Sequence, residues 1–490
     1  MSLSNRIKNQ HLLSRAGFGV SIDDIPHLDK NNNKFLKEII KASQDTIQPL
    51  EVQDPFVENT LKSMNPDERG DMSKEMFSEM NKPKGKAIRM QSGKDIQQLS
   101  IDWMHEMVYS KAILREKIAL FWHGHFACNV NNSMYEEELL SIIRNNALGD
   151  FRILLKEVSK SSAMILFLNN QQNSKKHPNE NFGREVMELF TLGRGNYTEN
   201  DVKEIARAFT GWQVKTGAGF FFNEKIHDTG NKTFLGETGN FNGDDAIDII
   251  LKQKQTAVFI SQRLYRFFVN ENIDASAIQW LSDRFYKNDY NISLLMEDIF
   301  SSDWFYNESN IGIQIKSPVV YIGGIRRFLP MTLQNEEVQI VLERLLGQWL
   351  FNPPNVAGWA GEKAWIDSSS LMLRLKIPSL IKNDETLDLK PKTDDDVQMG
   401  QKEYLQIGPK KKKSGGYQIL ASVDWSKLLK AIGEKDKTAV LQKMKSLLIQ
   451  TPDNKIDDAV IMGDKTDEDL IQFTRRITIE LMSTPEYQLC

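Results

Sequence analysis

The sequence predicts a mainly α-helical, globular fold built from many helices, with a small β-hairpin or sheet insertion near residues 212–236. Apolar residues recur at helical spacing along most of the chain, most regularly over residues 95–126. The insertion instead joins aromatic and β-branched residues around glycines, a composition typical of short strands and turns. The chain has 490 residues, 40% of them hydrophobic, which is enough for a sizeable core.

The amino-terminal third is predicted to consist mainly of helices. A short first helix around residues 8–18 ends at the glycines of Gly17-Phe18-Gly19. Residues 50–93 are rich in Lys, Glu, Asp, Asn and Met and show weak periodicity, so we expect a peripheral insertion there. Helices are then expected over residues 95–126, 135–147 and 151–160.

Two helices in the middle of the chain are marked by their capping residues. The first has an apolar stripe and ends at Gly193, a residue type that commonly terminates helices. The stripe consists of Phe182, Val186, Leu189 and Phe190. Thr198-Glu-Asn-Asp201 has the capping pattern that opens the second helix, which ends near Gly211. After the insertion, helical periodicity returns over residues 244–251, 256–269, 276–287 and 292–300.

The composition also divides the chain into regions. We expect residues 1–380 to form a main helical domain that contains the peripheral insertion. Residues 381–416 combine an acidic run, a run of four lysines and a glycine pair, which indicates a flexible charged linker. Residues 417–490 regain helical periodicity and are expected to form a C-terminal helical segment.

The charge and the cysteine count exclude several classes of function. The net charge of −4 gives no footprint for nucleic acid or for an anionic membrane surface. The two cysteines, Cys128 and Cys490, exclude a disulfide framework and a zinc site built mainly from thiolates. The amino terminus has no apolar stretch of signal-peptide length, and no apolar run approaches the ~20 residues of a membrane span. We therefore expect a cytoplasmic protein without a membrane span.

Four of the seven histidines lie in three short motifs rich in Gly, Asn and acidic residues. His123 and His125 belong to Phe121-Trp-His-Gly-His-Phe126, and His177 and His227 begin the other two motifs. Residues two apart on a helix face nearly opposite sides. His123 and His125 can therefore share a metal only if the backbone becomes extended, which Gly124 would permit.

Two groups of acidic residues have a structural and a functional interpretation each. Glu185 and Glu188 lie on one helix face beside Arg184, either facing solvent or facing a cleft where carboxylates bind a divalent ion or relay protons. His227-Asp228 either forms a turn in which Asp228 caps backbone amides, or supplies metal ligands or an acid/base pair.

The leading hypothesis is a metal-dependent or acid/base enzyme of unspecified substrate, in which a divalent ion would activate a bound water. The catalytic residues would be Glu185, Glu188, Arg184 and Arg207. The metal ligands would be His123, His125, His177, His227 and Asp228. The competing hypothesis is a non-catalytic helical scaffold that binds a partner, in which the same side chains form a buried hydrogen-bond network.

Distinctive motifs follow one another along nearly the whole chain. They include His11-Leu-Leu-Ser-Arg-Ala-Gly-Phe-Gly19, Phe121-Trp-His-Gly-His-Phe126, Asn179-Glu-Asn-Phe-Gly-Arg-Glu185, Ala208-Phe-Thr-Gly-Trp212, His227-Asp228 and Phe351-Asn-Pro-Pro-Asn-Val-Ala-Gly-Trp359. This succession resembles the bacterial domain-of-unknown-function 1800 family. The resemblance implies that residues 417–490 pack on the main domain, and it supplies no reaction or catalytic residues. Family members often lie beside genes for a sulfatase-like family, which implies a sulfatase-like partner. Many relatives look exported, whereas this chain shows no signal.

Overall fold

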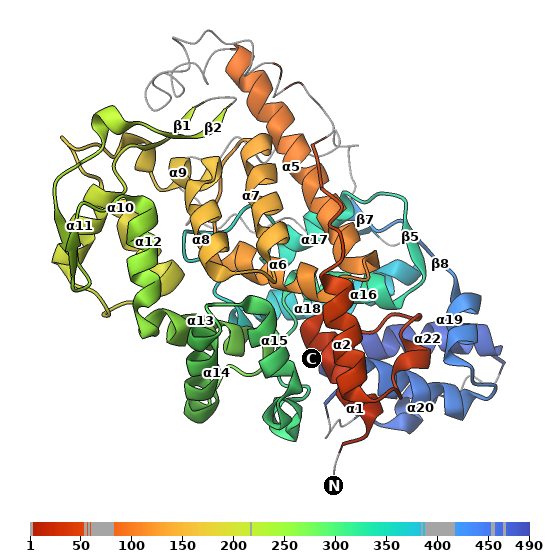
Figure 1. Cartoon of the computed structure of the whole chain (residues 1–490). Coiled ribbons are helices and arrows are strands. Elements are labelled where there is room, and N and C mark those ends of the chain that lie inside the picture. The colour runs from red at the N-terminus through yellow and green to blue at the C-terminus, as the bar shows by residue number, and fades with distance from the viewer. Residues whose placement is uncertain are drawn as a thin grey trace. The chain divides into compact units, whose positions relative to one another are not determined.

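The computed structural model describes residues 3–52, 56, 59, 83–215, 218–383, 386–387, 417–451, 456–463 and 467–490. Within them the fold is mainly helical, as the sequence predicts, and the strands form two-stranded sheets (Figure 1). The chain divides into two compact units. Unit 1 contains Met1–Asn31, Tyr306–Leu350 and Gly361–Cys490, and unit 2 contains Asn32–Phe305 and Phe351–Ala360. The division expected from the sequence, with residues 1–380 in a main helical domain, stays a prediction.

Unit 2 contains most of the helices expected from periodicity. They are α2 (Asn32–Ser43), α5 (Pro83–Tyr109), α6 (Ile113–His125), α7 (Ser133–Asn146), α8 (Phe151–Lys160), α9 (Ser162–Phe167), α10 (Glu180–Glu185), α11 (Glu199–Ala208), α12 (Gly243–Lys252), α13 (Lys254–Phe268), α14 (Ala275–Lys287) and α15 (Ile292–Ser301). The α8 helix has the expected bounds, whereas the region expected as one helix over residues 95–126 is two helices, α5 and α6.

The α5 helix begins before the region in which the sequence predicts a helix. Its first part covers residues 83–93, which were assigned to the peripheral insertion. The residues that it buries there include Gly85 and Ser92, followed by Asp95. Because these residues are small or polar, the helix has no hydrophobic periodicity in this part. The preceding residues of the expected insertion, from 53 to 82, lie outside the described residues apart from 56 and 59.

A π-helix, η3 (Val186–Thr191), continues directly from α10. The hydroxyl of Thr191 donates to the carbonyl oxygen of Val186 at 2.6 Å, which satisfies one acceptor in the wider turn. The wider turn changes which side chains face inward. Met187 is buried and Leu189 is only half-buried, whereas the regular 3.6-residue period had predicted Leu189 in the apolar stripe.

The β insertion consists of two antiparallel hairpins. In the first, β1 (Trp212–Lys215) pairs with β2 (Gly219–Phe222), and Trp212 lies opposite Phe222. In the second, β3 (Lys232–Phe234) pairs with β4 (Glu237–Gly239). Two short 3-10 turns precede the segments that contain His177 and His227. They are η2 (Asn170–Gln172) and η4 (Glu224–Ile226), respectively. The small sheets predicted near residues 212–236 are thus confirmed.

Unit 1 combines the first helix with helices from the last third of the chain. They are α1 (Asn5–Ala16), η1 (Ile25–His27), α16 (Pro318–Phe328), α17 (Val338–Leu346), α18 (Ser368–Asn383), α19 (Trp425–Ile432), α20 (Lys437–Leu448), α21 (Asp458–Met462), α22 (Leu470–Met482) and η9 (Glu486–Gln488). Two sheets pair β5 (Met331–Leu333) with β8 (Ala421–Val423) and β6 (Thr386–Leu387) with β7 (Tyr417–Gln418). Most of the predicted linker, residues 381–416, lies outside the described residues.

Unit 2 also buries a charged cluster around Glu116, in which the carboxylate is fully paired. Glu116 is fully buried and accepts hydrogen bonds from Arg115, from Arg144 and from the indole of Trp103, at 2.9–3.1 Å. Such pairing is what makes a buried carboxylate tolerable. None of the helices in the described ranges has the length and apolar character needed to cross a bilayer.

Candidate functional site

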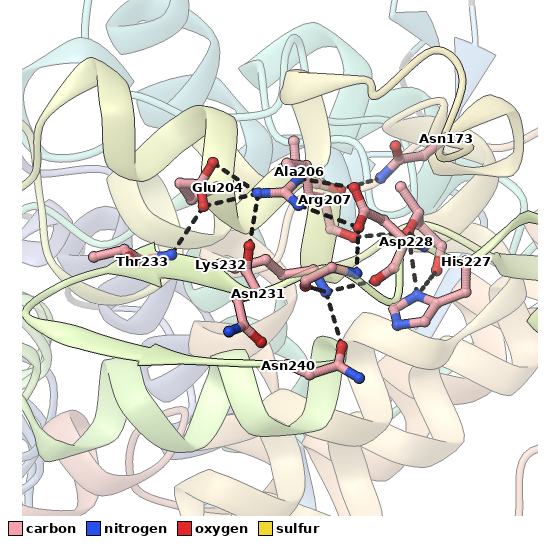
Figure 2. A network of polar contacts seen from close by, with 12 residues as sticks. Asn173, Glu204, Ala206, Arg207, His227, Asp228, Asn231, Lys232, Thr233 and Asn240 are labelled. Carbon is pink, nitrogen blue, oxygen red and sulfur yellow. Dashed lines mark hydrogen bonds and ion pairs between the residues drawn. The ribbon is translucent and has the colours of Figure 1, made fainter.

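The carboxyl-terminal half of α11 and the loop that leads into β3 share a group of polar residues, the Arg207 network. We define it as Glu204, Arg207, Thr210, His227, Asp228 and Lys232. A capping box between Thr198 and Asp201 fixes the start of α11. Glu204 and Arg207, three residues apart, lie on the same helix face. Figure 2 shows the guanidinium of Arg207 between the carboxylates of Glu204 and Asp228.

Arg207 uses its planar donors on both carboxylates. Its Nε donates to Asp228 Oδ2 at 2.8 Å and its Nη2 donates to Asp228 Oδ1 at 3.2 Å. Its Nη1 donates to both oxygens of Glu204 at 3.0 Å and to the carbonyl oxygen of Asn231 at 3.1 Å. Burial acts to raise the pKa of Asp228, but the hydrogen bonds from Arg207 and from the Gly230 N–H, together with the charges of Arg207 and Lys232, outweigh it and lower that pKa. Asp228 is therefore an ionised, fully engaged carboxylate.

Lys232 stabilises the loop that carries Asp228 from the buried side of that loop. Its side chain is fully buried, and its ammonium donates to the carbonyl oxygens of Asp228 at 2.5 Å and Gly230 at 3.0 Å. A longer contact of 3.4 Å reaches Oδ1 of Asn240. Burial lowers the pKa of Lys232. An ammonium surrounded by main-chain acceptors in this way holds a loop in one conformation.

His227 points into the end of α11. Its Nδ1 lies 2.8 Å from the carbonyl oxygen of Thr210, and the hydroxyl of Thr210 accepts the backbone N–H of Asp228 at 2.8 Å. A carbonyl oxygen can only accept, so Nδ1 carries the proton in the neutral ring and Nε2 is unprotonated. Burial lowers the pKa of His227, which favours the neutral ring. This orientation would allow Nε2 to act as a base or as a metal ligand. It is equally compatible with a purely structural role, in which His227 ties its loop to the end of α11.

The structure brings the His177 turn next to the His227 loop, although it does not bring the rings into contact. His177 is exposed, in a turn closed by backbone pairing with Ser174. The N–H of Lys175 in that turn donates to the carbonyl oxygen of Ile226 at 2.8 Å. Two of the three histidine motifs are therefore neighbours through their main chains.

His123 and His125 face different surroundings. The α6 helix continues through Gly124 instead of becoming extended, so the two rings point to opposite sides. His123 Nε2 accepts the N–H of Phe351 at 3.1 Å, and His125 Nε2 donates to the carbonyl oxygen of Phe190 at 3.1 Å. Burial lowers the pKa of His123 to about 4 and that of His125 to about 3. Both rings are neutral core residues at pH 7.

The predicted metal ligands are not gathered into one donor set. Across the part of the chain that the structure describes, no three His, Cys, Asp or Glu side chains lie together so that they could hold an ion. The physical reasons are the unbroken α6 helix, which separates His123 from His125, and the bidentate ion pair with Arg207, which occupies both oxygens of Asp228.

The acidic residues at the start of η3 form a second polar group. Arg184 pairs with Glu199 and Glu180, and Glu188 accepts hydrogen bonds from Arg194 at 2.7 Å and Tyr197 at 2.5 Å.

Glu185 differs from these neighbours, because it is half-buried and its side chain makes no hydrogen bond or ion pair with the described residues. Burial and the nearby Glu188 raise the pKa of Glu185, whereas Tyr197 and Arg194 lower the pKa of Glu188. The two carboxylates therefore have pKa values displaced in opposite directions.

Cys128, which follows His123 and His125 closely in the sequence, is buried in unit 2. Burial raises the pKa of its thiol well above the usual value. A nucleophilic cysteine needs the opposite shift and an exposed thiol, so this residue is an inert core cysteine.

Unit 1 contains a pocket that the sequence does not predict, lined by residues of α1, α16, α20 and the last turn of the chain. Its non-atom space, counted out to its open mouth, is about 420 Å³. Lys316, Tyr487 and Cys490 line it, and none of the predicted site residues does. Its lining residues come from segments far apart in the chain, which sequence patterns do not bring together.

Comparison with known proteins supports the kinship that the motifs suggest. The family model described as protein of unknown function (DUF1800) matches residues 11–489. Neither the curated proteins nor the solved structures include a match to the chain. Because the matched range is nearly the whole chain, this protein belongs to the DUF1800 family.

Proposed function

We propose that this chain is a non-catalytic helical protein that binds a partner protein, and that its polar motifs stabilise the fold that presents the binding surface. The observation that carries the proposal is the Arg207 network. Its central guanidinium donates to Asp228, Glu204 and the carbonyl oxygen of Asn231. A catalytic group needs a free donor, acceptor or lone pair facing substrate, and Arg207 and Asp228 are occupied by each other.

The other predicted site residues support the same conclusion. His123 and His125 are neutral and bonded to main-chain atoms, while Arg184 and Glu188 form ion pairs at the surface. Satisfied polar networks of this kind fix a unique packing of the elements that they join.

The partner that we propose is the sulfatase-like protein implied by the family's gene neighbours. The direct test mixes the two purified proteins and measures their sedimentation. Migration as one complex would support the proposal, and migration as two independent species would contradict it. Glu185→Gln should bind as well as the parent chain, because the Glu185 side chain belongs to no network that stabilises the fold under this proposal.

A second candidate function, an acid/base enzyme, is favoured by Glu185 alone. It is half-buried, has no partner among the described residues, and lies one turn before Glu188 where α10 becomes a π-helix. Single π-turns inside helices occur frequently at functional sites. In this mechanism Glu185 would transfer a proton, and Glu188, held ionised by Arg194 and Tyr197, would stabilise the charge that develops.

The enzyme candidate is tested by turnover of ester, glycoside and sulfate-ester substrates. Glu185→Gln should abolish any turnover that the parent chain shows. The matched control is Glu180→Gln, which alters a surface partner of Arg184 on the same helix and should leave turnover unchanged. Equal turnover in all three proteins would reject Glu185 as the catalytic group.

A further inference from the structure

One face of α13 carries three half-buried side chains, each one turn from the next, which we call the α13 stripe: Phe259, Arg263 and Phe267. The two phenylalanines pack against α6. The centre of the Phe259 ring lies 6.3 Å from that of His125, and the centre of the Phe267 ring lies 5.2 Å from that of Phe121. Arg263 therefore lies between two aromatic contacts, on the side of α13 that faces α6.

Arg263 has no counter-charge in the part of the chain that the structure describes. Its side chain makes no hydrogen bond or ion pair with the described residues, and its Nε is buried without an acceptor. Burial lowers the pKa of Arg263, and the positive charge of Arg266 acts in the same direction. A buried donor that is both charged and unpaired destabilises the chain that contains it. An acceptor supplied by another molecule would remove this cost.

The ring of His125, which packs beside the stripe, does not supply that acceptor. Its Nε2 donates to the carbonyl oxygen of Phe190, and its buried Nδ1 has no partner among the described residues. Burial lowers the pKa of His125 to about 3, and the positive charge of Arg263 acts in the same direction. The region beside the stripe therefore combines positive charge with unused hydrogen-bonding groups, and a negatively charged group would complement it.

We propose that the α13 stripe is the surface on which this chain binds its partner protein, and that the partner places an Asp or Glu side chain against Arg263. The inference rests on the proposed function and identifies the surface that carries it out. A carboxylate offers two acceptor oxygens to the planar guanidinium and supplies the missing negative charge. Arginine and aromatic side chains also dominate the binding energy of many protein interfaces, so Phe259 and Phe267 suit the flanks of this ion pair.

The test is a sedimentation titration of the full chain with the sulfatase-like protein. We expect Arg263→Met to weaken the complex about tenfold or more, because methionine keeps an apolar stem but removes the cation. The matched control is Arg284→Met on α14, which should leave the affinity unchanged, since Arg284 already pairs with Asp298 and lies outside the stripe. Equal affinity of the parent chain and both variants would overturn the docking surface and leave the proposed function standing. Absence of binding by the parent chain would overturn both.

The same experiment examines the chain alone. A dimer of the parent chain that dissociates in Arg263→Met would assign the stripe to a second copy and would overturn the proposal.

Two further measurements separate docking from a structural role. Arg263→Met should unfold at the same urea concentration as the parent chain or at a higher one, because it removes a charge that no described residue pairs. A lower midpoint would show that Arg263 stabilises the fold and would overturn the proposal. Arg263→Lys provides an amine that a carbodiimide joins to a contacting carboxylate with loss of water. Mass spectrometry should find position 263 linked to an Asp or Glu of the partner, and links at other positions alone would overturn the proposal.

Discussion

The imidazole Nδ1 of His227 lies 2.8 Å from the carbonyl oxygen of Thr210, just beyond the end of α11. The same Thr210 accepts the N–H of Asp228 through its hydroxyl, and that hydroxyl donates to the carbonyl oxygen of Arg207 at 2.7 Å. One threonine therefore joins the end of the helix to the loop of the second hairpin. The His227-Asp228 motif, which resembles a ligand pair in the sequence, supplies the two loop residues that bond to Thr210.

Thr210→Val should destabilise unit 2 by about 1–3 kcal/mol, because valine keeps the shape but leaves the buried N–H of Asp228 without its acceptor. Urea unfolding measures the change. The matched control is Thr233→Val in β3, where an exposed hydroxyl bonds only to Thr238. That control should change the free energy of unfolding by less than about 0.5 kcal/mol. Equal small effects at both positions would remove Thr210 from the network.

Gly358→Ala should destabilise unit 2 strongly, by about 3 kcal/mol or more, since it combines strain at positive φ with overpacking. Gly358 has φ +79°, and an added Cβ would meet the carbonyl oxygen of Gly124 at 2.4 Å. Gly361→Ala separates the two causes, because Gly361 has φ +78° but open space around its Cβ. Thermal unfolding should show a clearly larger loss for Gly358→Ala. Similar losses would mean that the contact with α6 adds nothing.

Glu136→Gln should stabilise the chain at pH 8 and have little effect at pH 4.5. Burial raises the pKa of Glu136 from 4.5 to about 8, so the folded chain binds a proton that the unfolded chain releases between these values. The wild-type protein therefore loses stability as the pH rises through this window, by up to about 1.4 kcal/mol per pH unit. Glutamine stays neutral and keeps the acceptor for the N–H of Val130. Parallel stability curves for the two proteins from pH 4.5 to pH 8 would refute the shift.

The sequence predicted the helices with strong periodicity because their packing follows a regular period. Phe151–Lys160 has its apolar residues on one face, and its bounds agree with α8. The π-helix could not be predicted, because a change from i→i+4 to i→i+5 hydrogen bonding is not visible in the residue types. As a result, Met187 is buried in the core, whereas Leu189, which the regular period had placed there, is half-buried.

The polar residues were easier to select than to interpret. Arg207 and Asp228 were both chosen from the sequence, yet their pairing across 21 positions depends on how the second hairpin packs on α11. Lys232, Arg15 and Lys316 were not chosen, because charged residues are expected at the surface unless a structure shows otherwise. The burial of Lys232 and Arg15 is a property of tertiary packing, which sequence patterns do not record.

The central claim is that the polar motifs stabilise the fold of unit 2, and a double-mutant cycle between Arg207 and Asp228 measures it most directly. The cycle compares the unfolding free energies of the parent chain, Arg207→Met, Asp228→Asn and the double variant. We expect a coupling energy of about 1–3 kcal/mol, since these side chains are only 27% and 17% exposed. The reference cycle between Arg284 and Asp298, where the arginine is 47% exposed, should give about 0.2–1 kcal/mol. A coupling between Arg207 and Asp228 no larger than this reference would contradict the claim.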